Sequence, residues 1–72
     1  MNTKDIVNRF IDYGISIKKI AEEAQVNKIS IVSLRKNVNI KQITEDKILM
    51  GLKKIALELY TITYSNDNDA KK

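Results

Sequence analysis

Apolar residues recur every three or four positions through most of this chain, which is the spacing of one face of an α-helix. Four segments show the pattern, and none shows the strict alternation of apolar and polar residues that is typical of a β-strand. We predict helices over about residues 4–13, 17–24, 28–36 and 44–62. The sequence therefore predicts an all-α fold of four helices, or at most five.

Short polar residues stand where each predicted helix would begin, and such side chains accept a hydrogen bond from a free backbone N–H. These residues are Asn2 or Thr3, Ser16, Asn27 and Thr44. Gly14 is placed to end the first helix, since glycine readily adopts a left-handed backbone. The last residues, 65–72, are polar and are expected to form a flexible, frayed tail. We therefore expect one domain over residues 1–64 followed by that tail.

Residues 16–37 combine two short predicted helices with a break of about three residues between them. The residues of this segment that we expect to face inward are Ile20, Ala21, Ala24, Val26, Ile31 and Leu34. Small side chains such as Ala21 and Ala24 are needed where two helices touch at a steep angle. The spacing is that of a helix-turn-helix motif.

The net charge of +4 lies entirely in the first half of the chain. Residues 1–41 contain eight Lys and Arg against four Asp and Glu, whereas residues 42–72 contain five of each. Between Asn27 and Gln42 there are four cations and no carboxylate. Such a segment suits a polyanion, although a solvated basic face has the same composition.

The composition also argues against several kinds of chemistry. The 72 residues include no His and no Cys, which excludes disulfides, thiolate catalysis and the usual zinc sites. There is no glycine-rich phosphate loop, and a chain this short offers little room for a substrate pocket. We therefore expect a protein that is not an enzyme and that uses no cofactor or metal. The first ten residues lack a secretory-signal pattern, and no 18-residue apolar stretch exists, so we expect a cytoplasmic protein without membrane contact.

Over about residues 3–62 the chain resembles the Cro and lambda-repressor type of phage and plasmid regulator, a family of small all-helical helix-turn-helix domains. In that family the first motif helix carries an apolar residue followed by alanine, as Ile20 and Ala21 do here. The turn position that usually holds glycine is Gln25 in this chain, and a left-handed residue other than glycine costs about 1 kcal/mol there. The resemblance implies a regulator in a bacterial host cell whose second motif helix enters the DNA major groove.

A helical wheel that points Ile31 and Leu34 at the core leaves an outer face on helix 28–36. Its members are Ile29, Val32, Ser33 and Lys36, with Lys28 at the N-terminal end. The start of helix 17–24 resembles the phosphate clamp of the family. Together these give the expected DNA contacts: Ser16, Lys18, Asn27, Lys28, Ile29, Val32, Ser33, Arg35, Lys36 and Lys41.

Two of these assignments have open alternatives. Arg35 lies on the flank of the face, where it could hold a phosphate or pair with Glu22 or Glu23. Lys18 could equally be an ordinary solvated lysine, as could its neighbour Lys19.

Helix 44–62 carries two apolar stripes. The first, expected to close the core, is Ile48, Leu49, Leu52, Ile55, Ala56 and Leu59. The second, about 140° away on the helical wheel, is Met50, Leu57, Tyr60 and Tyr64. A monomer would leave the second stripe in water, so we expect a homodimer, although scattered tyrosines are also normal on surfaces. Gly51 inside this helix predicts the close approach of another backbone.

These observations predict a dimeric, sequence-specific DNA-binding transcriptional regulator that represses by occluding a pseudo-palindromic operator in double-stranded DNA. An alternative keeps the same fold but changes the partner. Ile29 and Val32 are apolar residues on a face expected to be exposed, which would also suit a small phage protein that inhibits or modulates a host or phage protein, as an antirepressor or an anti-CRISPR protein does. The positive charge around these residues favours DNA.

Overall fold

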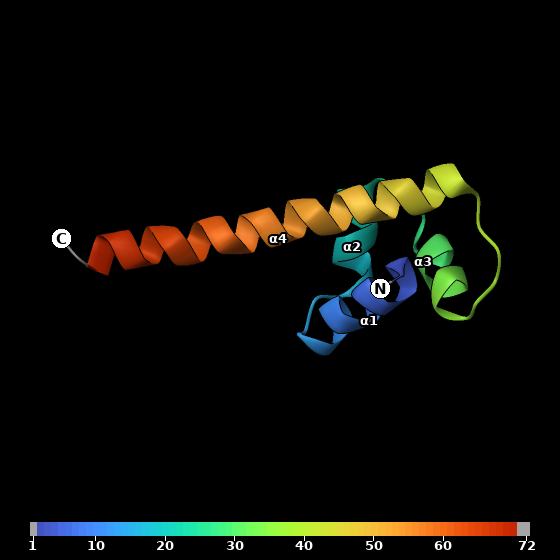
Figure 1. Ribbon diagram of the computed structural model, residues 1–72, viewed down its shortest axis with the longest axis horizontal. Coiled ribbons are helices and arrows are strands. Elements are labelled where there is room, and N and C mark those ends of the chain that lie inside the picture. Colours follow the sequence, from blue (N-terminus) through green and yellow to red (C-terminus); the bar gives the residue numbers. More distant parts are fainter. Residues whose placement is uncertain (1, 71–72) are drawn as a thin grey trace.

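The protein is described here by a computed structural model that covers the backbone of residues 2–70 and the side chains of residues 2–60. Its helices are α1 (Thr3–Asp12), α2 (Ile17–Ala24), α3 (Lys28–Arg35) and α4 (Gln42–Ala70). Residues 2–70 contain no strand, so the all-α prediction is confirmed. Helices α1, α2 and α3 gather beside the first half of α4, and the second half of α4 extends beyond them (Figure 1).

The first three helices begin at the predicted polar residues. Asn2 Oδ1 accepts a hydrogen bond from the N–H of Asp5 at 2.9 Å, which identifies Asn2 rather than Thr3 as the first cap. Ser16 Oγ accepts from the N–H of Lys19 at 3.0 Å. Asn27 Oδ1 accepts from the N–H of Ile29 at 2.9 Å. Each cap satisfies a backbone donor that has no partner within its helix.

The same three helices end in one kind of turn, with a residue in the left-handed conformation. These residues are Gly14 at φ +98°, Gln25 at φ 58° and Asn37 at φ 63°. In the turn after α2, for example, the N–H of Val26 donates to the carbonyl of Ala21 at 3.1 Å, the long hydrogen bond of a Schellman motif. The left-handed Gln25 agrees with the expectation drawn from the turn position, and Asn37 is a residue type that tolerates this conformation.

Helix α4 differs from the prediction at both ends. It begins at Gln42, and Thr44 lies in its first turn instead of capping it: the N–H of Thr44 donates to the carbonyl of Lys41 at 3.0 Å. A hydrogen bond from Gln42 Nε2 to Asp46 Oδ1 at 2.9 Å stabilises this N-terminal extension of the helix. The helix also continues to Ala70, past the predicted end near residue 62, and no glycine or proline interrupts it after Gly51. The flexibility expected of residues 65–72 stays a prediction.

The hydrophobic core lies where α1, α2 and α3 meet the first half of α4. Its buried members are Val7, Ile20, Ala21, Ala24, Ile31, Ile48, Leu52 and Ile55. Helices α2 and α4 approach each other closely at Gly51, where an added Cβ atom would lie 2.7 Å from the backbone and the Cβ of Ala24. The expectation that Gly51 marks a close backbone approach is therefore confirmed.

Some residues that we expected to face the core are exposed instead. Ala56 is exposed and Leu59 is 49% exposed, because the body formed by α1–α3 ends before α4 does. Both line an apolar groove together with Phe10, Tyr13 and Ile15 at the end of α1. The core-facing stripe of α4 is therefore longer than the core that it covers.

The connector between α3 and α4 packs unevenly against the core. The apolar residues from Asn37 to the first turn of α4 are Val38, Ile40 and Ile43. Val38 and Ile43 are exposed, and only Ile40 packs against the core. The early start of α4 explains part of this, since Ile43 then belongs to the first turn of a helix whose inner face lies elsewhere.

We predict that Gly51→Ala lowers the free energy of unfolding by about 2 kcal/mol, because the added methyl group overlaps the α2 backbone and overpacks the contact. Helix propensity alone predicts the opposite sign, a gain of up to about 1 kcal/mol. Urea unfolding followed by circular dichroism measures the difference. Lys54→Ala, an exposed position of the same helix, is the control and should change stability little. A more stable Gly51→Ala protein would contradict the close packing of α2 on α4.

Candidate nucleic-acid interface

Helix α3 has a buried side and an exposed side. Ile31 is completely buried and Leu34 packs against the core, whereas Ile29 is 70% exposed. Lys28 and Lys36 are exposed at the two ends of the helix, and Ser33 is half-buried. We call Lys28, Ile29, Ser33 and Lys36 the outer face of α3. The exposure expected from the helical wheel is confirmed for Lys28, Ile29 and Lys36, because the spacing of two inward-facing residues determines which side of a short helix faces water.

Val32 departs from the expected arrangement. It is half-buried and lines a shallow groove between α3 and α1, next to Asn8 and Asp12. Arg35 and Lys36 line the same groove, which therefore contains charges of both signs. Val32 is thus a boundary residue between α1 and the outer face.

Arg35 takes neither of the protein partners considered from the sequence. Its Nε donates a hydrogen bond to Oδ1 of Asn8 on α1 at 2.8 Å, and not to Glu22 or Glu23. A second polar bond, from Lys4 Nζ to Oδ1 of Asn37 at 2.9 Å, joins α1 to the turn that follows α3. Helix α1 therefore supports α3 through exposed polar contacts at the rim of the core.

Ser16 and Asn27 are both used as helix caps, so their side-chain oxygens accept bonds from the backbone of α2 and α3. The Asn27 amide N–H₂ and the Ser16 hydroxyl hydrogen keep their capacity to donate to an anion. Both residues are exposed, as are Lys18 in α2 and Lys41 immediately before α4. Their predicted contacts with DNA stay predictions.

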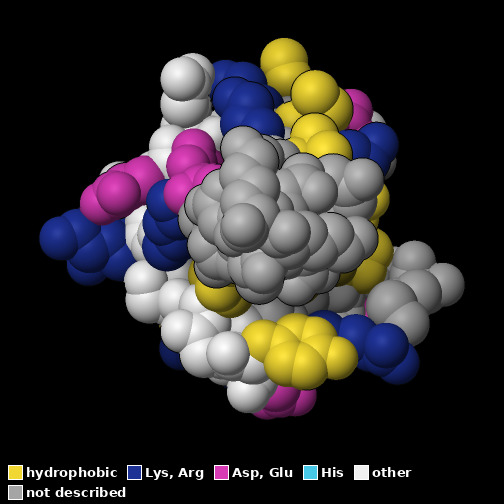
Figure 2. Space-filling view, turned by 90° about the vertical axis from the view of Figure 1, so that its left-hand side faces the viewer, with side chains coloured by type: hydrophobic (Ala, Val, Ile, Leu, Met, Phe, Trp, Pro, Cys, Tyr) yellow, Lys and Arg dark blue, Asp and Glu magenta, His cyan; other side chains and the backbone are white. Residues whose placement is uncertain are grey.

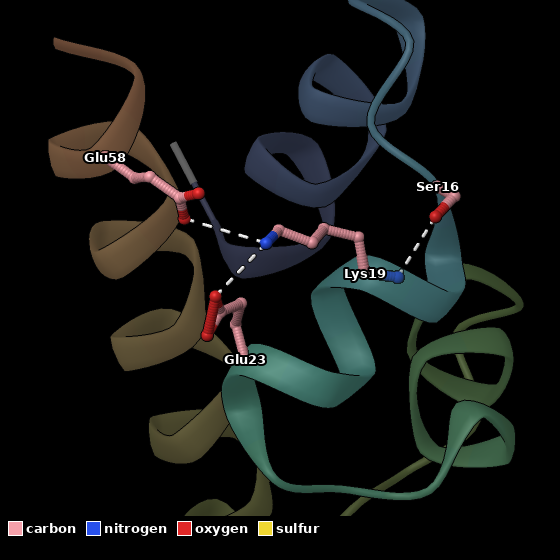
Figure 3. Close-up of polar contacts among 4 residues, drawn as sticks. All are labelled: Ser16, Lys19, Glu23 and Glu58. Atoms are coloured by element: carbon pink, nitrogen blue, oxygen red, sulfur yellow. Dashed lines mark hydrogen bonds and ion pairs between the residues drawn. The ribbon is translucent and has the colours of Figure 1, made fainter. Parts of the chain in front are cut away.

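The two adjacent lysines of α2 lie in different environments. Lys19 Nζ lies 3.2 Å from Glu23 Oε1 and 3.6 Å from Glu58 Oε2 on α4, so it connects the two helices (Figure 3). The hydrogen bond to Glu23 and the charge of Glu58 raise the pKa of the Lys19 ammonium. Lys19 is therefore ion-paired, although its side chain is 41% exposed, whereas Lys18 is exposed and takes part in neither ion pair.

Positive charge without a carboxylate partner is present on and beside the outer face of α3. Among residues 2–60 the ion pairs all involve Lys19, so Lys28, Lys36 and Lys41 have no carboxylate partner within that part of the chain. No carboxylate occurs in the sequence between Asn27 and Gln42. Within the described part of the chain, no group of three or more potential metal ligands comes together. The surface is suited to an anion, and no described group of side chains is suited to a metal ion.

Comparison with known proteins identifies no relative: no family model, no curated protein and no solved structure matches the chain. A search of the described helices for one that is long and apolar enough to span a bilayer is also negative.

Asn8, Asp12 and Lys4 are the residues that sequence analysis missed near α3. Asn8 and Arg35 are 27 positions apart, and Lys4 and Asn37 are 33 positions apart. No local periodicity or cap pattern points to such pairs. They become visible only when the packing of α1 on α3 is known.

We predict that Asn27→Ala lowers the free energy of unfolding by about 1 kcal/mol, because α3 loses the side chain that caps its first turn. Asn27→Ser is the matched control, since serine accepts the same bond and should keep most of the stability. Urea unfolding of the three proteins provides the comparison. Equal losses for the alanine and serine variants would show that the cap is not what Asn27 contributes.

Proposed function

We propose that this protein is a sequence-specific regulator that binds double-stranded DNA, with α2 and α3 as a helix-turn-helix motif of the lambda-repressor type and the outer face of α3 in the major groove. One observation carries the proposal. Burial of Ile31 turns Lys28, Ile29 and Lys36 to the outside, on a stretch of chain that contains four cations and no carboxylate. The major groove is about 12 Å wide and accepts an α-helix.

The surrounding residues supply the contacts that would orient α3 on the duplex. Ser16 and Lys18 stand at the N-terminal end of α2, where free backbone N–H groups attract phosphate. Asn27 and Lys41 flank α3 on either side along the chain. Such contacts position a protein on DNA without identifying bases. Binding over a promoter would then repress transcription by occlusion, in the cytoplasm of a bacterial host.

The outer side of α4 supports a homodimer as part of this function. Met50 and Leu57 are seven residues apart on one side of the helix, and they are 55% and 65% exposed. Tyr60, three residues further on, is 66% exposed, and the side chain of Tyr64 lies outside the described residues. Figure 2 shows exposed hydrophobic side chains above, to the right of and below the centre of this view. A second copy would cover this stripe.

A symmetric dimer determines the form of the operator. Two copies of α3 related by a two-fold axis contact two half-sites about 34 Å apart, one turn of the DNA helix, in a pseudo-palindrome.

A protein partner is the second candidate function, and the 70% exposure of Ile29 is the observation that favours it. In that case the same fold would inhibit or modulate another protein, as an antirepressor or an anti-CRISPR protein does. The two functions differ in their response to a pool of random duplexes. A DNA-binding regulator enriches one palindromic site and loses affinity steeply as salt increases, whereas a protein-binding module enriches none.

We predict that Lys28→Ala and Lys36→Ala each lower affinity for the enriched site about tenfold and reduce the slope of log K against log salt by about one, since each removes one phosphate or base contact. Fluorescence anisotropy at several salt concentrations measures both quantities. Lys54→Ala removes an exposed lysine of α4, away from α3, and should leave affinity and slope unchanged. Unchanged binding by both α3 variants would remove the assignment of the outer face.

We predict that Leu57→Asp converts the dimer to a monomer and lowers operator affinity on the order of tenfold or more, because an unpaired carboxylate in a dimer interface is strongly unfavourable. Sedimentation velocity measures the change in mass. Tyr13→Asp introduces the same carboxylate at an apolar residue that is 84% exposed after α1, outside the stripe, and should remain dimeric. A Leu57→Asp protein that sediments like the unchanged chain would refute the interface.

A further inference from the structure

The outer face of α3 has an apolar side chain at its centre. On a helical wheel Ile29 points almost directly away from the buried side made by Ile31 and Leu34. It is 70% exposed, and within α3 it is the only large hydrophobic residue with such exposure. Lys28 precedes it, and Lys36 lies on the same side two turns later. The residue best placed to meet a base therefore has no hydrogen-bonding group.

This chemistry restricts what Ile29 can recognise in DNA. Base edges in the major groove present hydrogen-bond donors and acceptors together with one apolar group, the C5 methyl of thymine. Packing isoleucine against the polar edges of the other bases would desolvate groups that it cannot satisfy. Packing it against a methyl group removes apolar surface of both partners from water.

We propose that Ile29 is a specificity-determining residue that contacts the methyl group of a thymine, so that each operator half-site has an A·T base pair at this position. The inference rests on the proposed DNA-binding function and adds the identity of one base to it. Val32 does not take this role, since it is half-buried against α1 beside Asp12. Ser33 and the two lysines would contact the neighbouring base edges or phosphates.

The surroundings of Ile29 favour DNA over a protein as the occupant of this surface. A stable protein interface buries about 800 Å² on each partner around an apolar centre. Along α3, Ile29 is a single exposed aliphatic side chain between cations, which is a small apolar centre for such an interface. A single apolar side chain between cations is sufficient to pack against one thymine methyl group in the DNA major groove.

The test replaces thymine by uracil, which removes only the methyl group. In the site enriched from random duplexes, each thymine is exchanged for deoxyuridine in turn, at equivalent positions of the two half-sites. We expect one position at which the exchange weakens binding of the unchanged protein about fourfold per half-site, the loss expected for one buried methyl group. Ile29→Ala should bind the thymine and uracil duplexes equally. Val38→Ala, which truncates an exposed valine outside α3, should discriminate as the unchanged protein does.

A second measurement does not depend on the variants. At the sensitive position the A·T pair is replaced by G·C with the cytosine in place of the thymine, and the cytosine is then methylated at C5. The unchanged protein should recover about fourfold in affinity on methylation. Enrichment of a site in which uracil is tolerated at every position, or an equal loss for Ile29→Ala, would overturn this inference and leave the DNA-binding function standing. Failure to enrich any site would overturn both.

Discussion

The arrangement of this molecule depends on the contact between α2 and α4 at Gly51. With no side chain at Gly51 and only a methyl group at Ala24, the two helices approach so closely that an added Cβ at Gly51 would lie 2.7 Å from the α2 backbone. This contact positions α2, and the short turn through Gln25 then positions the start of α3. The direction of the outer face of α3 therefore follows from one glycine on a different helix, and a larger residue at that point would move the whole pair.

The fold was predictable where its signals are local. Asn2, Ser16 and Asn27 each cap the helix that follows them, and a cap needs only residues within the next turn. The extent of the core along α4 was not predictable in this way. Whether Leu59 is buried depends on how far α1 reaches beneath α4, which is a property of the packed helices and not of the helical pattern. Periodicity shows which side of a helix is apolar, but it does not show where the neighbouring elements stop.

The residues of the candidate interface show the same difference between local signals, which could be predicted, and long-range contacts, which could not. The outward position of Ile29 followed from the spacing of Ile31 and Leu34, which lie in the same short helix. The bond between Arg35 and Asn8 did not, because the two residues are 27 positions apart and the sequence had offered nearer carboxylates as partners. The expected exposure of Val32 was wrong for the same reason, because the groove that partly covers it is formed with α1.

The support of α3 is unequal on its two sides. Toward the core it rests on the completely buried Ile31, whereas two exposed hydrogen bonds, from Arg35 and from Lys4, join its C-terminal end to α1. Exposed bonds of this kind exchange readily with water and contribute little net stability. The position of α3 therefore depends mainly on the burial of Ile31. Changes at the exposed C-terminal end of the helix should leave the core beneath it unchanged.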